Sequence, residues 1–280
     1  MRKHIISLSV LGICLLGASF SGNCLAADPI RINGSGSALD MMKPLVKAYL
    51  KANPDAGMAM EKPLGSSGAL KALLAGALDI VVSSKLLKPE EIAKGAQLKG
   101  YGRTPFAIVT EKSVPMKDIT TKELEGIYAG TTAKWHNGEN IRLVLRPRED
   151  IDTQILRGLS PGMDSAIAAS QARPGMIIAV TDPEAYGTVA KTPGGLGATG
   201  LTSVITEKLP LNVLSLNGVK PTPKNLANGT YPLSKEIGFV TTAKTTPAAL
   251  KFLNFVYSPQ GRSIAGKAGV LVTAPGNPGK

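Results

Sequence analysis

The sequence predicts a globular α/β fold, and three observations support its type, its globular character and the way two lobes would be joined. Short apolar runs typical of buried strands alternate along the chain with stretches whose apolar residues recur at helical spacing. The chain has 280 residues, of which 43% are hydrophobic and 19% charged, which is a globular composition. No Pro/Gly-rich linker interrupts its middle, so two lobes would be joined by strands. Alternation of this kind favours largely parallel sheets.

The first third of the chain predicts units in which a strand, a Gly/Ser turn and a helix follow one another. These segments are the strand Ile30–Asn33, the turn Gly34-Ser35-Gly36-Ser37, a helix with the apolar face Met42 to Leu50, the turn Gly65-Ser66-Ser67-Gly68, a helix with the apolar face Leu70 to Leu78, and the strand Ile80–Val82, which ends at Ser83-Ser84.

The remaining elements are marked by caps and by proline. Thr120 and Glu123 form a capping box that opens a short helix to Tyr128. Proline at a first helical position follows Asp182, Thr246 and Ser258, so a helix is expected at each of these residues. Further strands are predicted over Phe106–Thr110, Ile141–Leu145 and Ile237–Thr241.

Residues 1–26 predict a cleavable secretory signal peptide. Positive residues precede the mostly apolar stretch Ile5–Phe20, which is shorter than the roughly 20 residues that a membrane-spanning helix needs. Cys24-Leu25-Ala26 then places small residues where signal peptidase cleaves. A retained membrane anchor is the alternative; lipid attachment at Cys24 is disfavoured by the preceding Asn23. We expect the mature chain, residues 27–280, to be exported to the periplasm.

Removal of this segment narrows the possible chemistry. Both cysteines, Cys14 and Cys24, leave with it, His136 remains as the one histidine, and the formal net charge falls from +12 to +10. Zinc sites with cysteine ligands, iron–sulfur clusters and cysteine nucleophiles are therefore excluded. His136 lies in a predicted exposed turn, which disfavours a catalytic triad. We expect no enzymatic activity, no cofactor and no metal.

The positive net charge is not arranged as in a nucleic-acid-binding protein, and we expect no nucleic-acid partner. The lysines are scattered without a basic run, and aromatic residues make up only 4% of the chain, so no stacking platform for single strands is evident. The charge serves solubility or attracts small anions, and both interpretations stay open at this point.

The Gly/Ser turns have the design of an anion site. A helix start presents unpaired backbone N–H groups and a partial positive charge, glycine lets the backbone approach an anion, and serine adds donors. Ordinary helix capping is the alternative for any single turn. A dinucleotide fingerprint is absent because Leu39 stands where the third glycine is needed, and no phosphate-binding P-loop occurs.

Five segments together resemble one family, the periplasmic phosphate-binding proteins of bacterial ABC transporters, among the type II solute-binding proteins. They are INGSGSALDMMKPLVKAYL, GSSGALKALLAGALDIVVSSK, FAIVTEKSVPMKDITTKELEGIYAGTTAKW, KTPGGLGATG and ALKFLNFVYSPQGRSIAGKAGVLV. The resemblance implies a two-lobed α/β protein with hinge strands and a ligand cleft between the lobes. It places lobe 1 at 27–105 and 236–280, lobe 2 at 106–235, and the crossings near Gly102–Phe106 and Ser234–Phe239.

The resemblance also implies a set of oxyanion-binding residues. They are Ser35, Gly36, Ser37, Ala38, Leu39, Ser66, Ser67, Ser84, Arg146, Arg148 and Thr153. The chain departs from the family pattern at three places. Ala38 lacks the usual hydroxyl, Ser84 stands in place of an acid that accepts a proton from hydrogen phosphate, and Asp150 and Asp152 replace glycines. Asp150 is expected to cap the helix that follows, and either Arg146 or Arg148 is expected to face the cleft.

The function implied is capture of phosphate or a related tetrahedral oxyanion by a monomer that delivers it to an inner-membrane ABC permease. One alternative is an interaction protein on the same fold, with a changed ligand, that signals to a membrane sensor. Another is an exported phosphate-ester hydrolase, which the lack of metal ligands and of a histidine–nucleophile pair disfavours.

Overall fold

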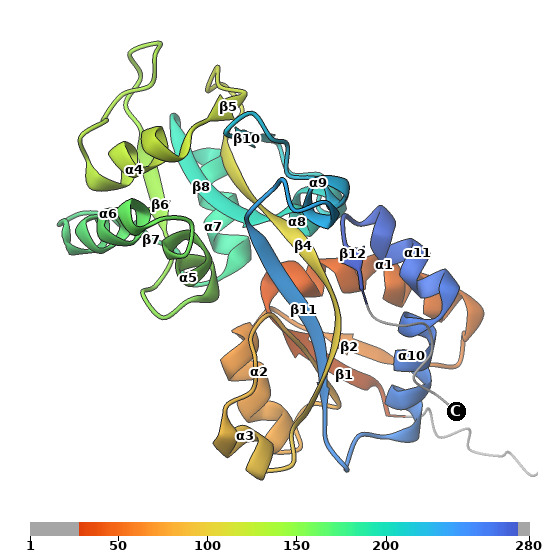
Figure 1. Cartoon of the computed structure of the whole chain (residues 1–280). Helices are drawn as coiled ribbons and strands as arrows, with labels where there is room; N and C mark the ends of the chain where they lie inside the picture. The colour runs from red at the N-terminus through yellow and green to blue at the C-terminus, as the bar shows by residue number, and fades with distance from the viewer. Residues whose placement is uncertain (1–27, 274–280) are drawn as a thin grey trace, which may run out of the picture.

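The computed structural model describes residues 28–273, and the predicted signal peptide lies outside them. The described residues form 12 strands and 11 helices (Figure 1). The strands are β1 Ile30–Gly34, β2 Met58–Met60, β3 Ile80–Ser83, β4 Gln97–Glu111, β5 Asp118–Ile119, β6 Arg142–Leu145, β7 Ile177–Ile178, β8 Gly195–Gly200, β9 Leu211–Val213, β10 Ser215–Leu216, β11 Ser234–Thr241 and β12 Leu271–Val272. The helices are α1 Gly36–Ala52, α2 Gly65–Leu74, α3 Pro89–Ala93, α4 Thr121–Ala129, α5 Ile151–Arg157, α6 Pro161–Ala172, α7 Asp182–Lys191, α8 Leu201–Thr206, α9 Pro223–Ala227, α10 Pro247–Tyr257 and α11 Pro259–Lys267.

The buried hydrophobic residues within 28–273 form four clusters, two in each of two lobes. Lobe 1 is built on β1–β3, α1 and the C-terminal helices α10 and α11, with residues such as Met41, Leu45 and Phe252 fully buried. Lobe 2 is built on β6, β8 and α4–α7, where Leu124, Met163 and Leu196 are fully buried. The two-lobed α/β fold expected from the sequence is thus confirmed, while the residue at which each lobe ends stays a prediction.

Two long strands join the lobes. β4 and β11 run side by side through the middle of the molecule, as Figure 1 shows in yellow and blue. The first part of β4 pairs with β11, and its second part pairs with β8 and β9 of lobe 2. The ladder between β4 and β11 runs the whole length of β11, over eight residue pairs from Ser234 with Pro105 to Thr241 with Gln97.

The joining strands also correct the expectation of largely parallel sheets. β1 pairs in parallel with β2 and β3, and β6 pairs in parallel with β7 and β8. Both β4 and β11 are antiparallel to their neighbours, which makes the sheet mixed. The expectation was wrong there because alternation predicts parallel pairing only inside each lobe, whereas the joining strands run back and forth between lobes.

The predicted helix starts agree with the structure to within a residue or two. Thr120, Thr246 and Ser258 are N-caps whose side chains accept backbone N–H groups. The turn at Gly65 forms the first residues of α2 rather than preceding it, and Gly65 has a φ of +70°, which glycine adopts without strain. Within residues 28–273, no helix combines the length and the apolar character needed to cross a membrane.

Candidate functional site

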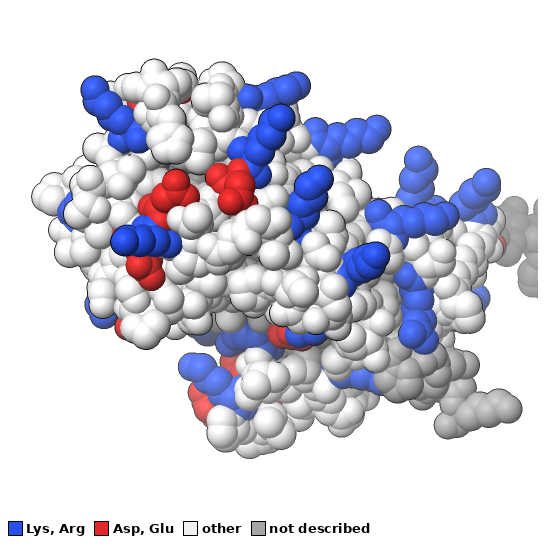
Figure 2. All heavy atoms as spheres, turned by 45° about the horizontal axis from the view of Figure 1, so that its top comes forward, with Lys and Arg blue, Asp and Glu red and all other residues white. Residues whose placement is uncertain are grey.

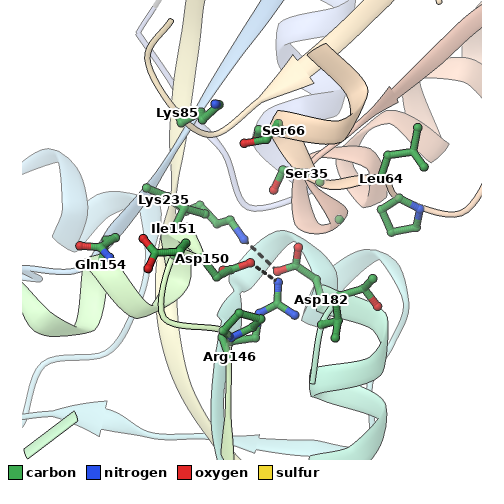
Figure 3. A pocket seen from close by; sticks show the side chains of 18 residues that line it. Ser35, Leu64, Ser66, Lys85, Arg146, Asp150, Ile151, Gln154, Asp182 and Lys235 are labelled. Carbon is green, nitrogen blue, oxygen red and sulfur yellow. Dashed lines mark hydrogen bonds and ion pairs between the residues drawn. The ribbon is translucent and has the colours of Figure 1, made fainter. Parts of the chain in front are cut away.

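A cavity of about 350 Å³ lies between the lobes, where the ends of the sheets meet four helix starts. Figure 3 shows side chains from both lobes pointing into this cavity. Figure 2 shows a groove on the surface between the upper and the lower part of the molecule. Its lining residues are Ser35, Gly36, Pro63, Leu64, Gly65, Ser66, Ser67, Lys85, Arg146, Pro147, Glu149, Asp150, Ile151, Gln154, Val180, Thr181, Asp182 and Lys235. Ligands of two-lobed α/β proteins bind at such strand and helix ends.

The lobe 1 wall consists of hydrogen-bond donors. Ser35 precedes α1 and Leu64 precedes α2, and neither side chain caps its helix. The first N–H groups of both helices therefore have no side-chain acceptor and lie at the cavity, next to the hydroxyls of Ser35, Ser66 and Ser67. Unpaired N–H groups of two helix starts, together with their dipoles, favour an anion.

Asn33 holds these two turns together. Its side-chain oxygen accepts hydrogen bonds from the N–H groups of Gly34 (2.8 Å) and Leu64 (2.9 Å), and its amide donates to the carbonyl of Lys62. The end of β1 is thereby fixed to the loop that enters α2. Ser66 is positioned in a similar way, because its Oγ accepts the N–H of Ser84 at 3.0 Å and keeps its own proton available for a ligand.

The lobe 2 wall is occupied by ion pairs. Arg146 follows β6, is 9% exposed, and donates to the carbonyl of Ala179 (2.9 Å) and to Asp150 Oδ2 (2.7 Å). Asp150 also caps α5 by accepting the N–H of Asp152. In the same wall Thr181 caps α7 by accepting the N–H of Glu184. The two helix starts at this wall, those of α5 and α7, are thus each capped by a side chain of the chain itself.

Lys235 is the most buried cation of the site. It lies on the joining strand β11, is 1% exposed, and its Nζ pairs with Asp152 Oδ1 at 2.5 Å and Asp182 Oδ1 at 2.8 Å. Asp152 and Asp182 come from the starts of α5 and α7, so the ammonium ties a joining strand to two helices of lobe 2. A buried cation requires such partners, since its desolvation is otherwise costly.

The pKa values of the two carboxylates on Lys235 are shifted in opposite directions. Burial raises the pKa of Asp152 to about 8, despite the nearby ammonium. Burial would also raise the pKa of Asp182, but Lys235 and Arg146 outweigh it and hold that pKa below its usual range. Burial therefore disfavours the ionised form of Asp152, whereas the two cations favour the ionised form of Asp182.

The side chain of Asp182, in lobe 2, also reaches the start of α1 in lobe 1. A Cβ placed on Gly36, at the first residue of α1, would lie 2.6 Å from both Cβ and Oδ2 of Asp182. Figure 3 shows one Asp182 oxygen facing Lys235 and the other pointing toward the Ser35 turn. Only glycine at position 36 allows this approach, so α1 of lobe 1 and α7 of lobe 2 meet here directly.

The structure brings together part of the predicted residue set. Ser35, Gly36, Ser66, Ser67 and Arg146 line the cavity. Arg146, not Arg148, faces it, and Arg148 lines a neighbouring hollow with Pro147 and Gln171. The predicted N-cap role of Asp150 is confirmed.

The other predicted residues are buried behind the wall. Ala38 and Leu39 belong to the core of lobe 1, and Ser37 packs against Gly200. The Thr153 hydroxyl donates to the carbonyl of Pro147, and the Ser84 hydroxyl is buried without a hydrogen-bond partner. None of these five side chains is among the lining residues.

Several lining residues were not predicted as ligand contacts, among them the polar or charged residues Lys85, Gln154, Asp182 and Lys235. Asp182 carries the signal of an ordinary helix start, and Lys235 precedes the apolar run from which its strand was inferred. The one signal in the sequence for Lys235 as a ligand contact was a lysine at an inward position of the predicted joining strand. His136 is exposed in a turn, as expected, and within residues 28–273 no group of three or more His, Cys, Asp or Glu is arranged to hold a metal ion.

Comparison with known proteins settles the family. A family profile described as a PBP superfamily domain matches residues 22–260, most of the chain. The chain belongs to the PBP superfamily. Among relatives in this superfamily, the phosphate-binding protein PstS of Borreliella burgdorferi is 25% identical over 288 residues, covering 97% of this chain and 99% of that protein. PstS of Bacillus subtilis is also 25% identical, over 86% of this chain and 79% of its own length.

Solved structures agree on the fold of this superfamily member. A protein from Clostridium perfringens that was solved with bound phosphate has a TM-score of 0.73 at 22% identity, covering 88% of this chain and all of that one. A phosphate-binding protein from Stenotrophomonas maltophilia has a TM-score of 0.67 at 15% identity, covering 89% and 92%. The resemblance indicated by the five sequence segments is therefore confirmed.

Proposed function

We propose that this protein is the extracytoplasmic solute-binding component of an ABC transporter and captures phosphate or a related tetrahedral oxyanion. The observation that carries the proposal is the pair of uncapped helix starts, α1 and α2, which meet at one cavity with three serines. The two PstS relatives are described as phosphate-binding proteins, which supports an oxyanion as the ligand.

In this proposal the residues have distinct roles. Ser35, Ser66 and Ser67 donate hydrogen bonds together with the first N–H groups of α1 and α2, and Arg146 supplies positive charge from the opposite wall. Ser37, Ala38, Leu39 and Thr153 shape the wall from behind. Ser84 places its N–H on Ser66 and so orients that hydroxyl.

Binding is proposed to work by closure and not by chemistry. A ligand that contacts both lobes stabilises the closed form relative to the open one, with bending at β4 and β11. The closed monomer then docks on a permease of the inner membrane. Export through the signal peptide predicted at residues 1–26 places the protein on the outer side of that membrane.

Calorimetric titration tests this proposal. Residues 27–280, unfolded and refolded to remove any carried ligand, are titrated with phosphate, sulfate, molybdate, tungstate and arsenate. At least one of these anions should bind, and Ser66→Ala should weaken it about fivefold, as expected for one lost hydrogen bond. Ser165→Ala, in exposed parts of α6, is the matched control and should change nothing.

The alternative is a binding-protein fold that signals to a membrane partner with a changed ligand. It is favoured by one observation, namely that Arg146 and Lys235 are already paired with the chain's own carboxylates. Silence across the anion panel would contradict the proposal and support this alternative. A sensor kinase, rather than a permease and an ATPase, encoded beside the gene would point the same way.

A further inference from the structure

The charges that line the cavity are segregated by lobe. All of its carboxylates, Glu149, Asp150 and Asp182, belong to lobe 2, whereas the lobe 1 wall offers hydroxyls, helix starts and one lysine, Lys85. Behind the lobe 2 wall, Asp152 adds a further acid. This half of the site therefore holds four acids against the two cations Arg146 and Lys235.

Each cation that lines the cavity already has a carboxylate partner. Lys85 Nζ lies 3.4 Å from Glu91, Arg146 lies 2.7 Å from Asp150, and Lys235 lies 2.8 Å from Asp182. Even with Asp152 protonated, Asp150 and Asp182 balance Arg146 and Lys235. A bare dianion would gain donors from lobe 1 but would meet carboxylates, without excess positive charge, on lobe 2.

The cavity is also larger than an inorganic oxyanion requires. Its volume of about 350 Å³ lies within the roughly 300–1,000 Å³ of pockets that hold small organic ligands. Phosphate has only five non-hydrogen atoms. The remaining space lies beside acids whose oxygens have lone pairs to spare, because a carboxylate offers about four acceptor positions.

We propose that the ligand is a small zwitterion, in which a phosphonate or phosphate monoester is joined by a short carbon chain to an ammonium group. The oxyanion lies against the starts of α1 and α2 with Ser35 and Ser66, and the ammonium is held by Asp150 and Asp182. The ligand then brings the positive charge that the lobe 2 wall lacks. This inference rests on the proposed function and narrows its ligand class.

A matched set of ligands tests the inference. The same protein is titrated with 2-aminoethylphosphonate, with 2-hydroxyethylphosphonate, which has the same size but no positive charge, and with inorganic phosphate. The ammonium compound should bind at least about tenfold more tightly than either of the others, an effect of the size expected for a partly desolvated charge contact. Equal or tighter binding of the hydroxyl compound or of phosphate would overturn the inference while leaving the proposed function intact. Silence for all three, together with silence across the inorganic panel, would remove both.

The variant Asp150→Asn separates recognition from stability. Asparagine is as good an N-cap as aspartate, so α5 should keep its start, while Arg146 loses its charged partner. Binding of 2-aminoethylphosphonate should weaken about tenfold, and binding of 2-hydroxyethylphosphonate should stay or tighten, because Arg146 becomes available to the anion. Weakening of both ligands by the same factor would indicate a structural role only and would overturn the inference.

The control for this variant is Asp164→Asn. Asp164 also pairs with an arginine of lobe 2, Arg157, but neither residue lines the cavity. This substitution should leave both affinities unchanged. A change in the ratio of the two affinities here would mean that the ratio reports general charge and not the site, which would also overturn the inference.

Discussion

The two walls of the cleft differ in whether side chains of the protein cap their helix starts. Each wall is built from two helix starts, α1 and α2 in lobe 1 and α5 and α7 in lobe 2. In lobe 1 the starts have no side-chain caps, whereas in lobe 2 Asp150 and Thr181 cap them. An uncapped start is available to a ligand, and a capped one is already satisfied. In the proposed function, the helix starts that receive the anion therefore belong to lobe 1, while lobe 2 contributes Arg146 and a carboxylate-rich surface.

The largest expected effect separates the two carboxylates that share Lys235. Asp182→Asn removes an ionised partner from a buried ammonium and should lower the free energy of unfolding by about 3–5 kcal/mol. Asp152→Asn should cost less, because burial raises the pKa of the Asp152 carboxyl and an amide imitates its neutral form. Urea unfolding of both variants provides the measurement. Equal losses would mean that the two acids share the charge evenly.

Contact between the walls is tested by Gly36→Ala. The new Cβ would lie 2.6 Å from Asp182, so α1 and α7 must separate. We expect a loss of about 1–3 kcal/mol in stability, as for overpacked sites, together with weaker ligand binding. Gly187→Ala in α7 is the control, since nothing lies within 4 Å of its added Cβ. That control should stabilise the helix by roughly 0.5–1 kcal/mol. Unchanged affinity in Gly36→Ala would show that closure does not need this contact.

The pH dependence of stability reports the same lysine network. An acid whose pKa is raised on folding binds its proton more tightly in the native state, so its contribution to stability falls as pH rises from about 4 toward 8. Asp152 should therefore add a decline in unfolding free energy over this range, of at most about 1.4 kcal/mol per pH unit. In Asp152→Asn that part of the slope should disappear. If the pH slope of the unfolding free energy of Asp152→Asn were identical to that of the unmodified protein, the proton taken up on folding would belong to a group other than Asp152.

The smallest expected effect concerns the one lysine on the lobe 1 wall. Glu91→Gln should release Lys85 from its ion pair while the amide still accepts the N–H of Lys88. Affinity for any anionic ligand should rise by up to about fivefold, the scale of a partly exposed ion pair, and the gain should shrink at high salt. Calorimetry at two salt concentrations measures it. A loss of affinity would show that Glu91 instead holds Lys85 in a position that the ligand needs.

Local sequence patterns were sufficient for the elements around the cleft but not for its electrostatics. The turns at Ser35 and Ser66 were identified because two Gly/Ser turns occur together with the family segments, although capping is the ordinary role of either turn alone, and both turns line the cavity. Ser37 belongs to the same turn as Ser35, yet it is buried behind the wall, because each residue along a helix rotates the side-chain direction by about 100° and Ser37 lies two residues further on. Ser84 follows β3, and its backbone N–H bonds to Ser66 while its side chain is buried away from the cavity. A motif therefore indicates the segment that faces a site more reliably than the individual side chains.

By itself, the sequence determined the alternating strands and helices, the helix caps, the family and the two Gly/Ser turns of the cleft. All of these are encoded in residues close to one another along the chain. Tertiary structure alone decided that Arg146 faces the cavity, that β4 and β11 are antiparallel, and that Lys235 is buried between Asp152 and Asp182. Lys235 and Asp182 are 53 residues apart, and their pairing follows from desolvation in the folded cleft, which no local pattern records.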